Sequence, residues 1–590
     1  MLTEKHFVND PNELVLDSLK GFVATSPHVN LDEENKVVYM KNIDQLKEDQ
    51  VTLFCGGGAG HEPAHAGFVG PGFLSAAVSG HIFASPSSSQ VLSCLKRIYS
   101  PKHGTVVIVK NYTGDILNFG RAIERFKAFQ ASKNITGTKV AMVVVGDDVG
   151  VVNENEEVDV GRRGLSGTIF VHKIASSAAA NGHTFEYVEK IANYVANNVF
   201  TIGSALSPSS IPGSGMPRIL GNDQVEFGMG IHNEPGFKII KLGSAKEMVS
   251  LMVDVVIGSK LFIKSSDSSN KSKKVHLLVN NLGALSNLEL GLVSKEAIER
   301  ISSSGYEIVR PFQGTFMTGL AMPGISLSLL VDPLDGSEFD LSKFIDFSSH
   351  APGWINHISV PNCSTQSDLF ANDNKFVGAN LDSVPSSPNR EMWIRIIDSI
   401  YSTCKEQEPE ITRLDTVMGD GDCGSVLMSG VESVHTAIHN DKIPIDDIAS
   451  AISSVSSFLE SSMGGTSGAI YCLFFDGVSQ SLASHGNKTP TNQQWAIAVK
   501  AGLDTIQRYS TARAGDRTMI DAIQPFSESL NGAHFNISEA LEAAKQGAEK
   551  TVEMQPKRGR AVYTGKGKGV ADAGAVGVCA IIEGLAKALA

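Results

Sequence analysis

The sequence predicts an α/β fold for the first part of the chain and an all-helical fold for the last part. Short apolar, β-branched runs alternate with helical patterns through about the first 340 of the 590 residues. After residue 386 nearly every segment repeats its apolar residues at helical spacing. We therefore predict an α/β domain over 1–346, a linker over 347–386 and an all-α domain over 387–590.

The strands expected in the first part are short runs that end in, or lead into, Gly, Asn or Asp. This is typical of buried parallel strands with ligand-binding loops at their carboxyl ends. Helical patterns over 87–99 and 116–131 separate some of them, and the Ser- and Lys-rich stretch 265–274 is expected to be a surface loop. The five predicted strands are 51–55 (VTLFC), 106–110 (VVIVK), 140–146 (VAMVVVG), 276–281 (HLLVNN) and 327–331 (LSLLV).

The predicted linker shows neither the strand-like runs of the first part nor the helical spacing of the last part. It contains Pro352, Pro361 and Pro385 among many Ser, Asn and Asp residues. Ser387 and Pro388 then form a plausible N-cap and first residue of a helix. About eight amphipathic segments follow up to Ala590, which predicts an antiparallel helical assembly. The first has one apolar stripe at i, i+3, i+4 and i+7, made of Trp393, Ile396, Ile397 and Ile400.

Composition excludes several classes of protein. The net charge is −13, from 50 Lys and Arg against 63 Asp and Glu, so a general nucleic-acid binder is not expected. The seven cysteines form no C-x-x-C pair, which favours reduced thiols in the cytosol. There is no secretory apolar segment and no apolar run of 18 residues, so we expect a cytoplasmic protein with no membrane partner.

An acidic loop, L-D-T-V-M-G-D-G-D-C-G, begins at Leu414. It places Asp415, Asp420 and Asp422 within eight residues, among three glycines. Carboxylates this close repel one another unless a cation lies among them, and Mg²⁺ prefers oxygen ligands. The register does not fit an EF-hand. The spacing alone leaves two possibilities, a divalent-cation site and a solvated acidic turn.

Further glycine-rich segments occur in the same helical part. M-G-G-T-S-G (463–468) precedes a helix expected to start near Ala469, so backbone N–H groups and the hydroxyls of Thr466 and Ser467 are positioned for a phosphate. An ordinary helix–helix turn is the alternative. The P-loop motif and the protein-kinase motifs are both absent from the sequence.

A glycine-rich loop with two histidines, G-G-G-A-G-H-E-P-A-H-A-G (56–67), follows the predicted strand 51–55. His61 can act as an acid or base near neutral pH. His61, Glu62 and His65 resemble the zinc-protease motif H-E-x-x-H, which requires a helix. Because Pro63 lies between the two histidines, we do not expect zinc here.

Two more polar loops are expected in the α/β part. K-N-Y-T-G-D (110–115) brings Lys110 and Asp115 to the edge of the sheet. F-G-M-G-I-H-N-E-P-G (227–236) places His232 between glycines and near Glu234, and a loop histidine held by a carboxylate is a candidate nucleophile or base. Either loop alone is more typical of a structural turn, but three such loops in one α/β region favour an active site.

These segments together resemble the ATP-dependent dihydroxyacetone (glycerone) kinases of the single-chain, two-domain type. The resemblance covers nearly the whole chain in the right order. It implies a substrate domain of two α/β subdomains, an eight-helix antiparallel barrel that holds ATP, and a homodimer. The matching segments are GGGAGHEPAHAGFVGPGFL, KNYTGDILNF, GRRG (161–164), GMGIHNEPG, LVNNLG (278–283), LDTVMGDGDCG, GGTSG and GDRTMIDA.

The resemblance also implies roles for individual residues. His232 matches the histidine that captures the substrate carbonyl as a hemiaminal, and His61 matches the base, with Asp115 assisting. Asp415, Asp420 and Asp422 match the carboxylates that hold two Mg²⁺ against ATP. Further substrate contacts match Gly58, Ala59, Gly60 and Lys110. Nucleotide contacts match Cys423, Gly424, Ser425, Thr466, Ser467, Met519, Arg560 and Asp572.

The chain departs from the family pattern at three places. D-A-G-A (572–575) replaces D-P-G-A, G-R-A-V (559–562) replaces G-R-A-S, and Ser510 stands where many members have Gly. These departures weaken the assignment of Arg560 and Asp572 as nucleotide contacts, but they do not change the expected reaction.

The expected reaction is phosphorylation of dihydroxyacetone by ATP, with D-glyceraldehyde as a second substrate. The fused architecture favours ATP as substrate over a phosphotransfer protein as phosphate donor. Two alternatives remain open. One is FMN cyclization (FAD-AMP lyase activity), which some animal relatives perform with Mn²⁺. The other is a non-catalytic dihydroxyacetone sensor, against which the complete set of acidic residues argues.

Overall fold

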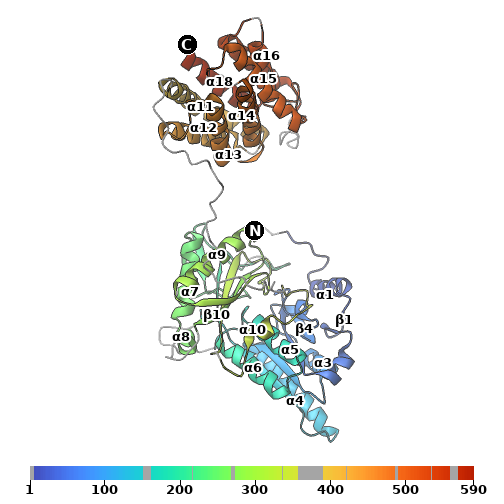
Figure 1. The fold of residues 1–590 in the computed structure, drawn as a ribbon. Helices are drawn as coiled ribbons and strands as arrows, with labels where there is room; N and C mark the ends of the chain where they lie inside the picture. The colour runs from blue at the N-terminus through green and yellow to red at the C-terminus, as the bar shows by residue number, and fades with distance from the viewer. Residues whose placement is uncertain are drawn as a thin grey trace. The chain divides into compact units, whose positions relative to one another are not determined.

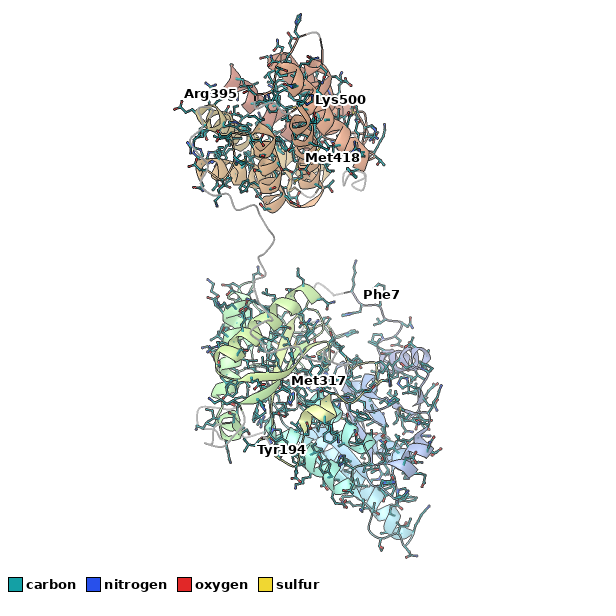
Figure 2. All side chains as sticks on the ribbon, viewed as in Figure 1. Phe7, Tyr194, Met317, Arg395, Met418 and Lys500 are labelled. Atoms are coloured by element: carbon teal, nitrogen blue, oxygen red, sulfur yellow. The ribbon has the colours of Figure 1, made fainter. Side chains whose placement is uncertain are left out.

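The computed structural model describes residues 5–150, 161–214, 217–266, 273–334, 336–355, 390–419, 421–485, 489–532, 534–557 and 569–590. The chain divides into two compact units, with the division between Ser364 and Thr365 (Figure 1). Figure 2 shows the side chains on both units.

Residues 347–355, which the sequence assigned to the linker, pack into the first unit. The Trp354 ring is buried with its centroid 4.9 Å from that of Phe312, and Gly353 donates its N–H to Gly67. The apolar and aromatic residues of this stretch find a place in the core despite its proline and serine content. Because 356–389 lie outside the described residues, with Ser387 and Pro388 among them, the domain boundaries remain predictions.

The first unit contains two six-stranded sheets. In the first, with order β1-β2-β4-β3-β5-β6, the strands β4, β3, β5 and β6 are parallel, and an antiparallel pair lies at one edge. This confirms three of the five predicted strands as parallel. The strands are β1 (Val29–Asp32), β2 (Val37–Met40), β3 (Thr52–Ala59), β4 (Ala76–Ile82), β5 (Thr105–Lys110) and β6 (Val140–Val145).

The second sheet, with order β11-β10-β12-β7-β8-β9, is mostly antiparallel. Only β10 and β11 run parallel. The expectation that 327–331 is a parallel strand is wrong, since β12 returns through the short connection 315–323 and parallel strands need longer crossovers. The strands are β7 (Val199–Ala205), β8 (Gln224–Phe227), β9 (Lys238–Lys241), β10 (Lys274–Asn281), β11 (Glu307–Gly314) and β12 (Gly324–Val331).

Helices α5 and α6 contribute to a buried core that includes side chains from both sheets. Helices α3 and α4 cover the other face of the first sheet, and α7 and α9 cover the other face of the second. The helices of this unit are α1 (Leu14–Thr25), α2 (Ile43–Asp49), α3 (Ser88–Ile98), α4 (Thr113–Ser132), α5 (Thr168–Ala180), α6 (Phe185–Asn198), α7 (Ala245–Gly258), α8 (Lys260–Ser266), α9 (Asn287–Ser303) and α10 (Leu341–Ile345), with the short 3₁₀ turn η1 (Ala66–Phe68).

The second unit has eight α-helices among its described residues, which confirms the predicted helical barrel. Each helix packs against the next in the chain, and α18 packs against α11, so the ring closes. The helices are α11 (Arg390–Met418), α12 (Cys423–His439), α13 (Ile448–Ser462), α14 (Gly465–His485), α15 (Asn492–Tyr509), α16 (Ile520–Leu530), α17 (Ile537–Lys550) and α18 (Ala573–Leu589), with the 3₁₀ turn η3 (Thr551–Glu553).

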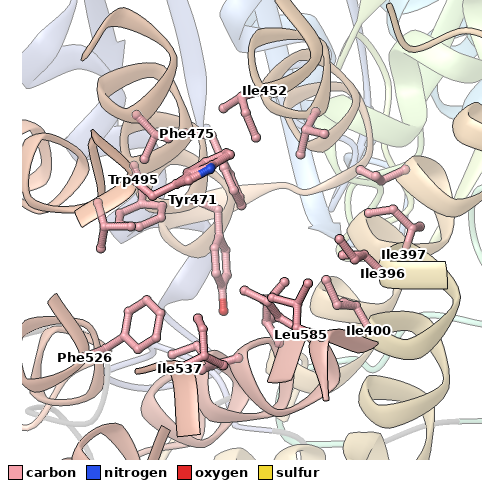
Figure 3. A pocket seen from close by; sticks show the side chains of 18 of the residues that line it. Ile396, Ile397, Ile400, Ile452, Tyr471, Phe475, Trp495, Phe526, Ile537 and Leu585 are labelled. Atoms are coloured by element: carbon pink, nitrogen blue, oxygen red, sulfur yellow. The ribbon is translucent and has the colours of Figure 1, made fainter. Parts of the chain in front are cut away.

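The barrel encloses an apolar cavity of about 520 Å³ (Figure 3). Ile397, Ile452, Tyr471, Phe526 and Leu585 are among the residues that line it. The acidic loop contributes no described residue to this lining, so the cavity is separate from the predicted cation site. Within the described ranges, no helix has the length and apolar character that a membrane span requires.

Candidate active site

Two histidines from distant parts of the first unit meet at the carboxyl end of β3. His61 follows β3 and His232 follows β8, and their Nε2 atoms lie 2.9 Å apart. The Phe83 ring packs against both, with centroid distances of 5.3 Å to His61 and 5.4 Å to His232. The structure therefore brings together the two histidines that the sequence singled out.

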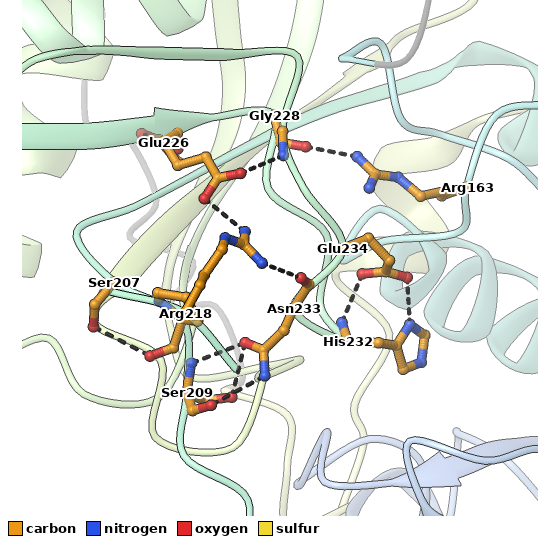
Figure 4. A network of polar contacts seen from close by, with 12 residues as sticks. Arg163, Ser207, Ser209, Arg218, Glu226, Gly228, His232, Asn233 and Glu234 are labelled. Atoms are coloured by element: carbon orange, nitrogen blue, oxygen red, sulfur yellow. Dashed lines mark hydrogen bonds and ion pairs between the residues drawn. The ribbon is translucent and has the colours of Figure 1, made fainter. Parts of the chain in front are cut away.

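Glu234 fixes the ring of His232 (Figure 4). Its Oε1 lies 2.7 Å from Nδ1 of His232, and its Oε2 accepts the backbone N–H of His232 at 2.8 Å. Burial acts to raise the pKa of Glu234, but the hydrogen bond and charge of His232 lower it to about 2. Because an ionised carboxylate only accepts hydrogen bonds, Nδ1 of His232 carries the proton and Nε2 is directed at His61.

A polar network fixes the loop that carries His232 (Figure 4). Arg218 donates to the Glu226 carboxylate at 2.6 Å and to the Asn233 carbonyl at 2.7 Å. The Asn233 side chain accepts the N–H of Ser209 at 2.8 Å. Asn233 itself has a φ of 66°, a left-handed conformation that asparagine tolerates better than most residues. These contacts hold the neighbouring imidazole in one position.

His61 is held in a similar way by a residue far along the chain. Its Nδ1 lies 2.7 Å from the carbonyl oxygen of Thr318, so Nδ1 donates and Nε2 faces His232. The ring is completely buried. Burial first, and then the charges of Lys110 and His232, hold the pKa of His61 well below its usual value.

Lys110, Tyr112 and Asp115 form a polar group beside the histidines. The ammonium of Lys110, the Tyr112 hydroxyl and Asp115 Oδ1 are buried and have no hydrogen-bond partner in the described part of the chain. Burial lowers the pKa of Lys110 and raises that of Asp115, and each opposes the effect on the other. The Tyr112 ring meets His232 edge-on at 4.6 Å. Buried polar atoms without partners are rare, so this group suits a small polyhydroxy ligand.

The glycine segment differs from its predicted loop. Gly56, Gly57, Gly58 and Ala59 continue β3, and the turn begins only at Gly60, with φ 96°. A Cβ on Gly58 would lie 2.7 Å from the backbone nitrogen of Ala84, so packing requires glycine there. A Cβ on Gly57 would instead lie 3.4 Å from Cε of Lys110 and 3.6 Å from Oδ2 of Asp115. Gly57, which the sequence analysis did not select, is thus the glycine that faces the polar group.

In the second unit the acidic residues gather at the amino ends of α12 and α18. Asp415 Oδ2 accepts the N–H of Cys423 at 3.0 Å. Asp422 precedes α12, and Asp572 caps α18 through the N–H of Ala575 at 2.9 Å. Burial raises the pKa of Cys423 to about 12, and the charges of Asp415, Asp572 and Asp422 act in the same direction. The three carboxylates thus lie within electrostatic range of one thiol.

The surroundings of Asp572 disfavour its ionised form. Burial raises its pKa to about 6, and the charges of Asp521 and Asp415 add to this, while the Ala575 N–H and Arg517 oppose it. Carboxylates that repel one another at the amino ends of helices suit a divalent cation together with a phosphate chain, because the cation neutralises the first and the helix ends bind the second.

The remaining predicted nucleotide contacts have different outcomes. The helix expected near Ala469 begins at Gly465, so Thr466 and Ser467 lie in its first turn. Gly574 lies in the first turn of α18, two residues after Asp572. A Cβ on Gly574 would lie 3.5 Å from Cβ of Met519, so Met519 lies close to Asp572. Gly424 is buried against α11, where a Cβ would lie 2.3 Å from Thr412 Oγ1, and Ser425 is exposed.

Asp420 and Arg560 lie outside the described residues, as does Val562. The other two departures from the family pattern are accommodated. Ser510 ends α15 with an extended backbone that any residue adopts. Ala573 is the first residue of α18, a position that accepts proline without requiring it.

Comparison with known proteins defines the class. The Dak1 domain family matches residues 20–347, and the DAK2 domain family matches residues 417–587. Dihydroxyacetone kinase 2 of Saccharomyces cerevisiae is 37% identical over 615 residues, which cover 100% of both chains. The triokinase/FMN cyclase of Homo sapiens is 35% identical over 597 residues, again covering 100% of both.

A solved structure covers both units. The dihydroxyacetone kinase of C. freundii is 30% identical, with a TM-score of 0.63 and 99% of both chains covered. A second structure of that protein contains AMP-PNP and Mg²⁺ and has a TM-score of 0.62. An α/β unit joined to an all-helical unit, with full-length relatives that are kinases, defines an ATP-dependent kinase. The chain belongs to the dihydroxyacetone kinase family.

Sequence reasoning missed several residues that shape the first site. Thr318 orients His61 from 257 positions away, and Phe83 packs on both imidazoles, but neither lies in a motif. Gly57 and Tyr112 lie inside two of the motifs, at 56–67 and 110–115, but nothing in the motifs sets them apart from their neighbours. The alternation of side chains along β3 would have directed attention to Gly57 had the strand been extended by four residues.

Proposed function

We propose that this protein transfers the γ-phosphoryl group of ATP to a hydroxyl of dihydroxyacetone. The observation that carries the proposal is the His61–His232 pair beside Lys110 and Asp115, whose Nζ and Oδ1 have no hydrogen-bond partner among the described residues. A small ketone with two hydroxyls fits this combination of a nucleophile and polar groups. Full-length similarity to dihydroxyacetone kinases supports the same substrate.

We further propose that Nε2 of His232 captures the ketone as a hemiaminal. The Nδ1–H is held by Glu234, so the lone pair is on Nε2. Nε2 forms a bond to the carbonyl carbon, the C=O π electrons move to oxygen, and that oxygen takes a proton from Nε2 of His61. The positive charge then lies on the substituted imidazole, beside the ionised Glu234.

After capture, His61 is neutral and its Nε2 is free to accept a proton. We propose that it accepts the proton of the substrate hydroxyl that attacks the γ-phosphorus, assisted by Asp115. The low pKa of His61 favours the neutral ring that this role needs. Aldehydes present the same electrophilic carbon, so D-glyceraldehyde is proposed as a second substrate, whereas glycerol has no carbonyl to capture.

Asp415 and Asp422, with Asp420, are proposed to hold two Mg²⁺ per ATP. Their oxygen-only donor set fits Mg²⁺. Burial raises the pKa of the nearby Asp572, and the charges of Asp521 and Asp415 add to this, so a cation at these carboxylates would be favoured. Bound Mg²⁺ would supply charge neutralisation on the phosphates. The backbone N–H groups at the amino ends of α12 and α14 are proposed to contact the phosphates, with Thr466, Ser467, Met519 and Arg560 as further nucleotide contacts.

A coupled assay tests the reaction. Purified protein with ATP, Mg²⁺ and dihydroxyacetone should release ADP and form one phosphorylated triose per ADP. Native intact-mass measurement without ATP should detect one dihydroxyacetone per chain. No substrate-dependent ADP release with either triose would refute the kinase proposal.

FMN cyclization is a second candidate because relatives at 35% identity are named triokinase/FMN cyclase. FAD with Mn²⁺ should then yield riboflavin 4′,5′-cyclic phosphate and AMP in equal amounts. Detection of these products, absent from the Asp422→Asn variant, would assign the activity to the second unit.

We also propose a cytosolic homodimer. The six described cysteines are free thiols, which accords with a reducing compartment. Light scattering on the eluting protein should give twice the 62.7 kDa chain mass, and a monomer mass would overturn the dimer.

A further inference from the structure

Three potential metal ligands meet where α11 begins and α12 ends. Asp398 lies near the start of α11, while His435 and His439 lie in the last turns of α12. The acidic loop joins the opposite ends of the same two helices. Asp415 follows Asp398 by 17 residues (415 − 398), about 25 Å at 1.5 Å per residue, so this cluster is separate from the proposed Mg²⁺ site.

The three ligand atoms already have nearly the arrangement that a metal ion imposes. Nε2 of His435 lies 3.0 Å from Oδ1 of Asp398, and Nε2 of His439 lies 2.8 Å from the same oxygen. Ligands about 2.0–2.2 Å from a tetrahedral Zn²⁺ are separated by about 3.3 Å. An outward movement of a few tenths of an ångström would therefore admit an ion.

The helix geometry and packing favour binding. Histidines at i and i+4 lie on one face of a helix, the arrangement that chelates zinc in helical motifs. The Tyr401 ring stacks on His435 at 4.4 Å and restricts its rotation. Asp398 and His435 are partly exposed and His439 is exposed, so an ion can enter and water can complete the coordination.

A second cluster in the first unit provides a contrast. Cys55, His65 and His172 also lie within metal-binding distance of one another, but all three are buried. Burial raises the pKa of the Cys55 thiol to about 12, and the nearby Lys110 ammonium opposes a second cation. The helical cluster has neither obstacle.

We propose that Asp398, His435 and His439 bind one divalent transition-metal ion of the zinc class, with water as the fourth ligand. Two imidazoles and one carboxylate form a borderline donor set that selects Zn²⁺ over Mg²⁺ and Ca²⁺. The ion joins α11 to α12 at the ends remote from the acidic loop. Its effect is on the stability of the barrel and not on the chemical step.

Zinc titration of the full-length protein in excess Mg²⁺ tests the site. The excess Mg²⁺ is present to occupy the acidic loop, so that the Zn²⁺ that is counted is bound elsewhere. We expect the wild type to bind one more Zn²⁺ per chain than His439→Ala or Asp398→Asn. His485→Ala is the matched control, because His485 also lies in the last turn of a helix, α14, but outside the cluster. Equal zinc stoichiometry in all four proteins would overturn the proposal.

Two further measurements remove any ambiguity about folding. Zn²⁺ should raise the unfolding temperature of the wild type and of His485→Ala, and should raise it less in the two cluster variants. Co²⁺ in the site should give the intense visible absorption of a tetrahedral ion, which His439→Ala should lose. Absorption of the weak octahedral kind in the wild type would contradict the proposed ligand set.

Discussion

Nε2 of His61 lies 2.9 Å from Nε2 of His232, while each ring already donates its Nδ1 proton, to Thr318 and to Glu234 respectively. Two neutral rings in these tautomers would oppose lone pair to lone pair. A hydrogen bond between them therefore requires one shared proton and one positive charge on the pair. The shared proton is positioned to be given to a carbonyl oxygen when Nε2 of the other ring attacks.

We predict that His232→Ala abolishes capture of dihydroxyacetone and leaves ATP binding unchanged. The variant removes the only proposed bond between protein and substrate, so turnover should fall by ~10²-fold or more. Intact mass with dihydroxyacetone and a nucleotide titration provide the two measurements. His103→Ala, at the opposite end of β5 from Lys110, is the control. A triose adduct that persists in His232→Ala would exclude this histidine as the nucleophile.

We predict that His61→Asn lowers kcat far more than it weakens substrate binding. Loss of a general base typically costs ~10²–10⁴-fold in rate. The adduct should still form, more slowly, because the bond is made by His232 and water can supply the carbonyl proton. If the adduct disappears while the chemical step is unchanged, His61 positions the ketone and the base is Asp115 or a water.

We predict that Asp422→Asn removes nearly all kinase turnover but leaves the triose adduct intact. A lost carboxylate weakens Mg²⁺ binding and misplaces the γ-phosphate, at a cost of ~10²-fold or more. Asp446→Asn, an exposed carboxylate of the same unit, should behave as wild type. Full activity of Asp422→Asn at saturating Mg²⁺ would refute the cation site.

The fold was predictable to the extent that its signals are local. Strand runs and helical stripes depend on neighbouring residues, so both fold classes and the eight helices were predicted correctly. The antiparallel direction of β12 was not predictable, because it depends on pairing with β7 and β10, which lie far away in the sequence. The extent of β3 was missed because its last residues are mostly glycines, which read locally as a loop.

The candidate site was predictable where a motif marked it. His61, Lys110, Asp115 and His232 do come together. The first three lie at the ends of the neighbouring strands β3 and β5, and His232 reaches them from the second sheet, after β8. The orienting contact of Thr318 could not be inferred, since it arises from tertiary packing alone. The tautomers could not be inferred either, because they depend on which acceptor each Nδ1 meets.

In the Mg²⁺-free protein, we predict that Asp572 makes stability fall as pH rises from about 4 to about 6. Its pKa is raised from 3.8 to about 6, so in this window the folded state binds more protons than the unfolded state, and stability decreases with pH. The loss is up to ~3 kcal/mol, reduced by solvent screening. Asp572→Asn keeps the helix cap and should flatten this part of the profile. Parallel profiles for the two proteins, measured by denaturant unfolding, would contradict it.

Substitutions at two glycines of β3 distinguish an effect on packing from an effect on substrate binding. A Cβ on Gly57 would lie 3.4 Å from Lys110 Cε and 3.5 Å from its Nζ, which is ordinary contact, so Gly57→Ala should fold normally. The methyl group covers the ammonium and the Asp115 carboxylate, so adduct formation should fall by about tenfold or more, the effect of ~1.4 kcal/mol.

Gly58→Ala provides the matched comparison one residue further along the strand. Its Cβ would lie 2.7 Å from the Ala84 nitrogen and 2.9 Å from the Phe83 carbonyl carbon, and backbone cannot move aside as a side chain can. We expect a loss of ~1–3 kcal/mol in the free energy of unfolding. Thermal unfolding and adduct mass, measured on both variants, should therefore give opposite patterns. A normal adduct yield in a stable Gly57→Ala protein would mean that the substrate does not approach Lys110 and Asp115 across this face of β3.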